Sequence, residues 1–154
     1  MPNYIKWIRS KVGNDKIILN FAGACIVDDE GRLLLQKRSG QENAWGFPGG
    51  AMELGESAEE TAVREIEEET GFIVTVEQLL GVYTKYHDYY PNGDSAQPII
   101  IVFLCSIVGG EMNANNSETD ELRFFPKEQI PNLFNKQHND ILQDFLSGKT
   151  ILHR

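Results

Sequence analysis

One short segment concentrates carboxylates that could do chemistry together. Between Glu53 and Glu69 the sequence has eight glutamates and one arginine, a local charge of −7 (eight negative, one positive). Carboxylates held close together raise one another's pKa. Hard divalent cations such as Mg²⁺ or Mn²⁺ relieve this repulsion, because they prefer oxygen ligands. The segment therefore indicates a metal site, and the alternative is the solvated side of an ordinary surface helix.

A helix over residues 58–69 would hold these carboxylates on one side. Ser57 is a suitable N-cap, Glu60 completes a capping box, and Gly71 stands where a C-terminal cap belongs. At about 100° per residue, an acidic side made of Glu65, Glu68 and Glu69 lies beside an apolar stripe made of Ala62, Val63, Ile66 and Thr70. A solvated face would lie opposite the stripe and carry bases at i+4. The pattern therefore favours metal binding, with Arg64 and Glu67 directed towards solvent or a lateral partner.

Strands dominate the rest of the chain. Strands are predicted at 16–27, 32–38, 72–86 and 98–108, with a short one inside 118–131. The turn DDEG at 28–31 predicts that the first two strands form a hairpin, and Gly23 marks a bulge or a close approach. Residues 39–50 are expected to be irregular, 4–12 a short helix or a strand, and 135–147 a helix that Gly148 ends. The pattern predicts helices packed on a mixed sheet.

Length and charge limit the classes of function. The 154 residues fit one domain, 1–154, with enough chain for a proper core. The net charge of −9 repels polyanions, so a long nucleic-acid partner is not expected. No apolar run approaches the roughly 20 residues of a membrane span, and the start lacks the features of a secretory signal. Cys25 and Cys105 sit in apolar runs and are expected to be buried reduced thiols, so a cytoplasmic protein is the default.

The acidic helix belongs to a longer pattern. From Gly50 the chain has five residues, Glu56, seven residues, Arg64-Glu65, an aliphatic and one further residue, Glu68-Glu69, one residue, Gly71 and the apolar Phe72. This resembles the Nudix box, the signature of the Nudix hydrolases, with each of its defining positions filled over 50–72. The flanking stretches GRLLLQKR, WGFPGG and ETDELRFFPKEQIP agree with it. The resemblance is weakest at 1–20 and 84–98.

The resemblance implies an α/β fold, an α/β/α sandwich with a mixed β-sheet between helices. It also implies hydrolysis of a nucleoside diphosphate linked to another moiety, with Mg²⁺ or Mn²⁺ as cofactor. The implied metal ligands are Glu65, Glu68, Glu69 and the carbonyl of Gly50. Glu56 and Arg64 match the ion pair that orients the box. A homodimer fits the family, although no residue demonstrates one.

The chemistry expected for such a site is attack of water on phosphorus, which needs no serine, histidine or cysteine nucleophile. Cations that bridge phosphate oxygens lower the barrier and activate the water. One glutamate is expected to be the general base. Glu65 is the candidate inside the box, and Glu118 or Glu121 are candidates in the acidic loop SETDE. A solvated charge is the alternative for each of the loop residues.

Several residues near the box could hold the substrate. Arg38 ends a predicted strand and could meet a phosphate, or could be an ordinary surface arginine. Trp45 and Phe47 could stack on a base, with core packing as the alternative. Tyr89 belongs to an aromatic stretch, YTKYHDYYPNGDSAQ, that could close over a ligand, form a dimer contact or cover the sheet edge. His87 has no partner at a spacing typical of a metal site.

Two classes of function follow. The first is a metal-dependent pyrophosphohydrolase whose partner is a small nucleotide, with nucleoside triphosphates ranked before ADP-ribose and dinucleoside polyphosphates. Capped or triphosphorylated RNA ranks lower, because the chain lacks a basic stripe. The second is a non-catalytic nucleotide sensor on the same fold, which would be expected to have lost some of the carboxylates and to carry an effector domain.

Overall fold

The computed structural model describes residues 3–40, 42 and 44–154, so two positions of the segment predicted to be irregular, 41 and 43, lie outside the described residues. Nine strands form two sheets in this part of the chain. The larger sheet has the order β4-β1-β7-β5-β9, with β6 also paired to β7. Its strands are β1 (Ile17–Ile26), β4 (Gly49–Ala51), β5 (Phe72–Tyr83), β6 (Asp88–Tyr89), β7 (Ser95–Gly110) and β9 (Leu152–His153). The smaller sheet has the order β3-β2-β8 and consists of β2 (Leu33–Arg38), β3 (Trp45–Gly46) and β8 (Thr119–Phe125).

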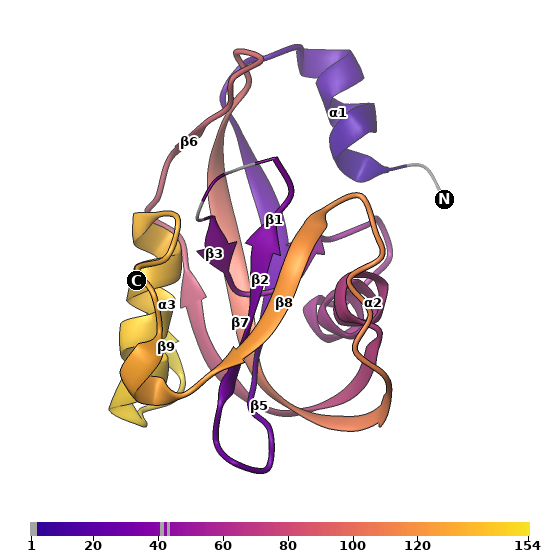
Figure 1. Ribbon diagram of the computed structural model, residues 1–154. Helices are drawn as coiled ribbons and strands as arrows, with labels where there is room; N and C mark the ends of the chain where they lie inside the picture. Colours follow the sequence, from indigo (N-terminus) through magenta and orange to yellow (C-terminus); the bar gives the residue numbers. More distant parts are fainter. Residues whose placement is uncertain (1–2, 41, 43) are drawn as a thin grey trace.

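The predicted mixed sheet with flanking helices is confirmed. In the larger sheet β1 runs parallel to β7 and β9 parallel to β5, whereas the other pairs are antiparallel. The helices are α1 (Tyr4–Val12), α2 (Ala58–Thr70) and α3 (Lys136–Ser147), with a short 3₁₀ turn at Lys127–Gln129. α2 and α3 lie on opposite sides of the strands (Figure 1). The segment that the sequence left open at 4–12 is therefore a helix.

The predicted hairpin between the first two strands is wrong. β1 and β2 share only one isolated bridge, between Val27 and Leu33. Both edges of β1 are already occupied, by β4 and β7, so β2 crosses to the second sheet and pairs with β3 and β8. The short turn between β1 and β2 therefore connects two different sheets. Strands that are adjacent in the sequence do not show by themselves whether they pair with each other.

Helix ends follow the predicted signals. Ser57 and Glu60 form the complete capping box of α2, and Gly71 ends this helix in the left-handed conformation with φ of 80°. Asn135 caps the start of α3, and Gly148 ends it. Because these caps satisfy backbone groups that a helix end leaves unpaired, they fix where α2 starts and stops relative to the sheet.

Two apolar clusters make up the core. One lies beside α3 and includes Leu35, Phe47, Tyr83 and Ile141, and the other lies beneath α2 and includes Ala24, Ile26 and Ile66. Cys25 and Cys105 are buried free thiols, as predicted. Within the described ranges, no helix combines the length and the apolarity that a membrane crossing requires.

Tyr83 links the central sheet to α3 through a buried hydrogen bond. Its side chain is fully buried, and its hydroxyl donates to Asp144 Oδ2 at 2.8 Å. We expect Tyr83→Phe to lower the free energy of unfolding by about 1.5 kcal/mol, because Asp144 loses a buried donor. Urea unfolding would measure this loss. Tyr89→Phe, which removes the hydroxyl of a side chain that is 77% exposed, should change stability by less than about 0.5 kcal/mol.

Candidate active site

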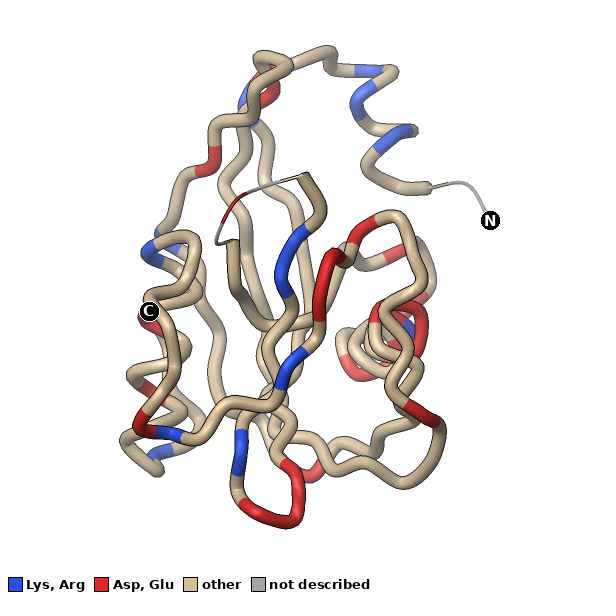
Figure 2. Tube along the Cα trace, viewed as in Figure 1, with Lys and Arg blue, Asp and Glu red and all other residues tan. Residues whose placement is uncertain are grey.

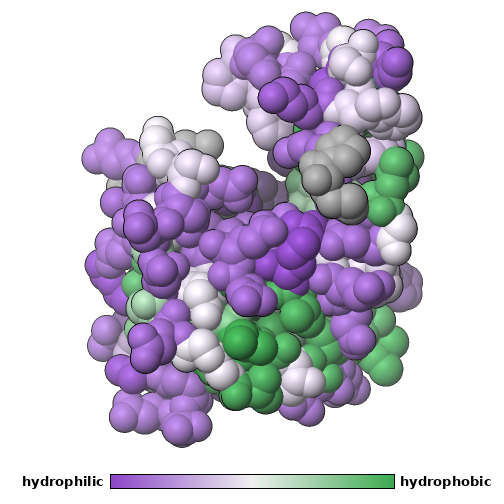
Figure 3. Space-filling view, turned by 90° about the vertical axis from the view of Figure 1, so that its right-hand side faces the viewer, coloured by the Kyte–Doolittle hydropathy of each residue, from purple (hydrophilic) through white to green (hydrophobic). Residues whose placement is uncertain are grey.

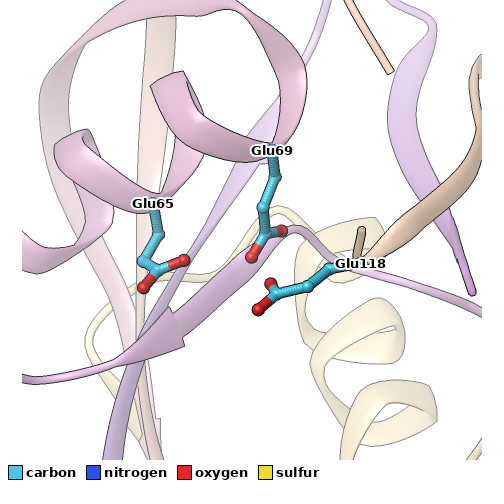
Figure 4. Close-up of side chains that lie close together, drawn as sticks. All are labelled: Glu65, Glu69 and Glu118. Atoms are coloured by element: carbon cyan, nitrogen blue, oxygen red, sulfur yellow. The ribbon is translucent and has the colours of Figure 1, made fainter. Parts of the chain in front are cut away.

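Three carboxylates from two parts of the chain meet in one place. Glu65 and Glu69 lie one turn apart on α2, and Glu118 comes from the loop before β8. A carboxylate oxygen from each lies within 4.8 Å of the others. Figure 4 shows the three side chains directed towards one another, and Figure 2 shows the acidic residues gathered on α2 and on the segment leading into β8.

The loop before β8 is tied to the end of α2 by hydrogen bonds. The Asn116 side chain donates to the carbonyl oxygen of Glu69 at 3.0 Å, and the backbone N–H of Glu118 donates to Asn116 Oδ1, also at 3.0 Å. The Glu118 carbonyl in turn accepts from the N–H of Ser39 at 3.0 Å. These bonds explain how a residue 49 positions away from Glu69 (118 minus 69) comes to lie beside it.

Gly50 of β4 leaves free the space that the carboxylate of Glu65 occupies. A Cβ atom at Gly50 would collide with the carboxylate of Glu65. The N–H of Gly49 donates to Glu69 Oε2 at 3.3 Å. A side chain at Gly50 would therefore displace the carboxylate of Glu65 from its place against β4.

Burial makes these carboxylates costly to ionise without a cation. Glu69 is 3% exposed. Desolvation, followed by the charge of Glu65, raises the pKa of Glu69 to about 9. Desolvation also raises the pKa of Glu65, against the opposing effect of Arg64. Hard divalent cations prefer oxygen ligands and supply the positive charge that a group of buried carboxylates lacks. The carboxylates of Glu65, Glu69 and Glu118 therefore fit such an ion.

Arg64 organises one side of this cluster. Its guanidinium donates to both carboxylate oxygens of Glu56, at 2.6 and 2.9 Å, and to the carbonyl of Ala51 at 3.1 Å. Its Nη1 donates to Glu65 Oε1 at 2.8 Å. The expected lateral partner of Arg64 is thus Glu56, but Arg64 also neutralises part of the acidic cluster.

Glu68 lies apart from the three converging carboxylates. Its side chain is 58% exposed, and its Oε2 lies 3.3 Å from Arg64 Nη1. The sequence pattern missed this contact because the arginine precedes Glu68 by four residues instead of following it. A metal-ligand role for Glu68 stays a prediction.

The cluster opens into a cavity of about 750 Å³. The surface is hollowed beside the upper lobe that contains α1 (Figure 3). The cavity is lined by six of the residues predicted from the sequence: Arg38, Phe47, Gly50, Glu65, Glu69 and Glu118. The structure therefore brings the predicted phosphate ligand, one predicted aromatic contact and the carboxylates to one space.

Besides Glu56, Arg64 and Glu68, three predicted site residues do not line the cavity. Trp45 is buried in the core, edge-to-face with Phe125 at 5.0 Å between ring centroids. Tyr89 is 77% exposed. Glu121 pairs with Arg123 on β8. In place of Trp45 and Tyr89, the cavity wall contains Tyr90 and His138.

His138 was missed as a site residue because the sequence offered it no partner at metal-ligand spacing. It lies on the apolar side of α3, three residues before the buried Ile141. A polar ring on the apolar stripe of a predicted helix is the one signal that could have singled it out. The residues that surround it come from distant parts of the chain, so the sequence alone could not name them.

Comparison with known proteins identifies the family. Residues 20–145 match the model of the NUDIX domain, and the chain belongs to the Nudix hydrolases, enzymes that act on phosphoric anhydride bonds. It is 38% identical over 126 residues to an ADP-ribose pyrophosphatase of Methanocaldococcus jannaschii, covering 80% of this chain and 71% of that protein. It is 33% identical over 123 residues to a Bacillus subtilis protein provisionally named 8-oxo-dGTP diphosphatase, covering 80% and 76%.

A solved structure of a UDP-X diphosphatase superposes with a TM-score of 0.67 and 29% sequence identity. The match covers 98% of this chain and 74% of that chain. The fold is therefore the Nudix fold, as the resemblance implied.

The ion pair of Glu56 and Arg64 should make stability depend on pH. Hydrogen bonds from Arg64 lower the pKa of Glu56 from 4.5 to about 2. Because the folded-state pKa is the lower one, the pair stabilises the fold above pH 4.5, and this contribution is lost as the pH falls towards 2. We expect Glu56→Gln to cost about 2 kcal/mol at neutral pH. Urea unfolding in EDTA should show this cost shrinking at about pH 3.5, and the exposed Glu59→Gln should cost much less than Glu56→Gln at neutral pH.

Substitutions of the two loop candidates for the general base, Glu118 and Glu121, should have different effects on kcat. Glu118 faces the cavity and Glu121 does not. We expect Glu118→Gln to lower kcat at least about 100-fold, the range typical of a lost general base or ligand. Glu121→Gln should keep kcat within about threefold, as expected for a group outside the site. Equal losses in steady-state assays of the two variants would contradict this assignment.

Proposed function

We propose that this protein is a divalent-metal-dependent pyrophosphohydrolase that cleaves a nucleoside diphosphate linked to another group, by attack of water at phosphorus. The convergence of Glu65, Glu69 and Glu118 at the wall of a nucleotide-sized cavity carries this proposal. Cavities of about 300–1,000 Å³ are typical of small-molecule sites. The membership in the Nudix family supports it independently.

The carboxylates would hold Mg²⁺ or Mn²⁺. Glu65 and Glu69 are the proposed ligands from α2, with the Gly50 carbonyl and Glu68 as further candidates. When bound, such a cation neutralises phosphate charge and lowers the pKa of water. Arg64 would keep Glu65 oriented through the 2.8 Å hydrogen bond.

Glu118 is the proposed general base. It is the exposed member of the three carboxylates, so water can reach it and its proton can leave to solvent. It comes from a segment other than α2 and points towards Glu65 and Glu69 (Figure 4), and it lines the cavity. Glu65 is the second candidate, but its hydrogen bond to Arg64 favours a fixed ligand over a proton acceptor.

Arg38 is the proposed phosphate ligand. Its guanidinium lies over the ring of Phe134 at 4.3 Å, and its Nε is buried with no hydrogen-bond partner in the described part of the chain. Burial lowers its pKa, and the charges of Glu69 and Tyr90 oppose this shift. Because a guanidinium stays protonated in proteins, Arg38 offers a buried charge and an unused donor at the cavity wall.

The substrate class is narrowed by the relatives without being fixed to one compound. Two proteins with similar chains are named for ADP-ribose and UDP-X, and one for 8-oxo-dGTP. These names favour diphosphate-linked nucleosides at least as strongly as the triphosphates that the sequence ranked first. The charge of −9 still argues against a long nucleic acid. A cytoplasmic location and a homodimer stay predictions.

A nucleotide panel tests the proposal. Native protein with Mg²⁺ or Mn²⁺ would be compared with Glu69→Gln on ADP-ribose, UDP-sugars, dinucleoside polyphosphates, dGTP and 8-oxo-dGTP. We expect metal-dependent release of a nucleoside monophosphate from one substrate class, and a loss of at least about 100-fold in the variant. Metal-dependent binding without turnover of any compound would refute the hydrolase and favour a nucleotide sensor.

A further inference from the structure

His138 is a buried polar side chain on the wall of the cavity that the proposed chemistry does not use. It lies in the first turn of α3 and is 4% exposed. Its backbone N–H donates to the capping side chain of Asn135 at 2.8 Å. Together with Ile141, it forms the contribution of α3 to the cavity wall.

One ring nitrogen of His138 has a fixed role. The backbone N–H of Phe47 donates to His138 Nδ1 at 3.0 Å. A nitrogen that accepts a hydrogen bond carries no proton, so the neutral ring has its proton on Nε2. Burial, with a further contribution from Arg38, lowers the pKa of His138 well below its usual value. At neutral pH the ring is therefore uncharged and donates through Nε2, which has no partner among the residues that the structure describes.

The ring is also held in its orientation. It packs against Phe134 at 4.6 Å and stacks on Phe47 at 6.0 Å between centroids. A Cβ at Gly46 would lie 3.0 Å from His138 Nδ1 and 2.8 Å from the Phe134 ring. The missing side chain at Gly46 is thus what lets the start of α3 approach β3. A donor that is fixed in this way costs little entropy when it binds a ligand.

The polar groups of the cavity follow one another in a definite order. Arg38 pairs with Thr119 across β2 and β8, and the N–H of Ser39 donates to the carbonyl of Glu118 at 3.0 Å, so Arg38 lies next to the loop that holds Glu118. Arg38 lies over the ring of Phe134, which also contacts His138. The carboxylates, Arg38 and His138 therefore form a series along the wall. If the diphosphate binds at the first two, the nucleoside extends towards His138.

We propose that His138 donates a hydrogen bond from Nε2 to an acceptor on the nucleoside part of the substrate, and so helps to select which nucleotide binds. The acceptor is a carbonyl oxygen or ring nitrogen of the base, or an oxygen of the ribose. This inference rests on the proposed function for the direction in which the substrate lies. In this arrangement His138 contacts the nucleoside, whereas the carboxylates and Arg38 contact the phosphates.

Two substitutions separate the two nitrogens of the ring. His138→Asn can retain an oxygen near the position of Nδ1 that accepts from Phe47, but it has no donor at the position of Nε2. His138→Gln places an amide N–H near Nε2 and loses the acceptor for Phe47. The exposed His153 provides a matched control, His153→Asn.

Equilibrium binding with Mg²⁺ measures the contact without turnover. The probes are the α,β-methylene analogues of ADP, GDP, UDP and CDP, and methylenediphosphonate, which lacks a nucleoside. We expect His138→Asn to weaken binding of at least one nucleoside analogue about tenfold, the effect of one buried hydrogen bond. His138→Gln should recover part of this loss, and binding of methylenediphosphonate should not change. A loss restricted to some bases places the acceptor on the base, and an equal loss for all four places it on the ribose.

Unchanged binding of every analogue by His138→Asn, or an equal loss for methylenediphosphonate, would overturn the inference. Thermal unfolding would show whether each variant is folded. If His138→Asn is not folded, long-range ¹H–¹⁵N NMR of native protein decides the question. The Nε2 resonance should then show a protonated nitrogen that shifts with the nucleoside analogues and not with methylenediphosphonate. Because this experiment measures no hydrolysis, a native protein that binds without turnover would refute the enzyme proposal alone.

Discussion

The close packing of α2 against the backbone of β4 positions the whole acidic site. The carboxylate of Glu65 fills the space that a Cβ at Gly50 would take, and Glu69 accepts a hydrogen bond from the N–H of Gly49. Burial of carboxylates is unfavourable unless positive charge compensates it. This contact therefore creates both the geometry of the site and its demand for a cation. The packing of α2 on β4 and the binding of a cation by Glu65 and Glu69 are therefore expected to stabilise each other.

Charge compensation in this unit comes from two arginines with different tasks. Arg64 is saturated by Glu56, Glu65 and the Ala51 carbonyl, so it holds the box together. Arg38 has an unused donor in a buried position, which suits it to a ligand. The two residues are of the same type. What distinguishes the structural role of Arg64 from the binding role proposed for Arg38 is whether the guanidinium N–H groups already have hydrogen-bond acceptors.

The second wall of the cavity depends on the start of α3. Phe134 donates its backbone N–H to the carbonyl of Trp45 at 3.0 Å, and Gly46 leaves the space for the rings behind it. This docking places His138 beside Phe47, whose N–H selects the tautomer of the imidazole. The helix proposed to hold the metal, α2, and the helix proposed to contact the nucleoside, α3, thus lie on opposite sides of the strands (Figure 1). Residues of both helices line the cavity, so its two ends can bind different parts of a substrate.

The sequence by itself determined the local features of this protein. The caps of α2 at Ser57 and Gly71, the spacing of Glu65 and Glu69, and the 50–72 signature all depend on residues within one short segment. Their physics is that of helical periodicity and end-capping, which a linear pattern expresses directly. The fold class followed from the same signature.

Only the tertiary structure decided which distant residues join that segment. It separated β1 from β2 because both edges of β1 are occupied. It brought Glu118 to the cavity and left Glu121 outside, although both belong to the same acidic stretch. It also buried Trp45 in the core and placed His138 Nδ1 where it accepts a hydrogen bond from the N–H of Phe47. These outcomes depend on strand pairing and on space left by glycines across the sheets, and such long-range contacts leave no periodic signal in the chain.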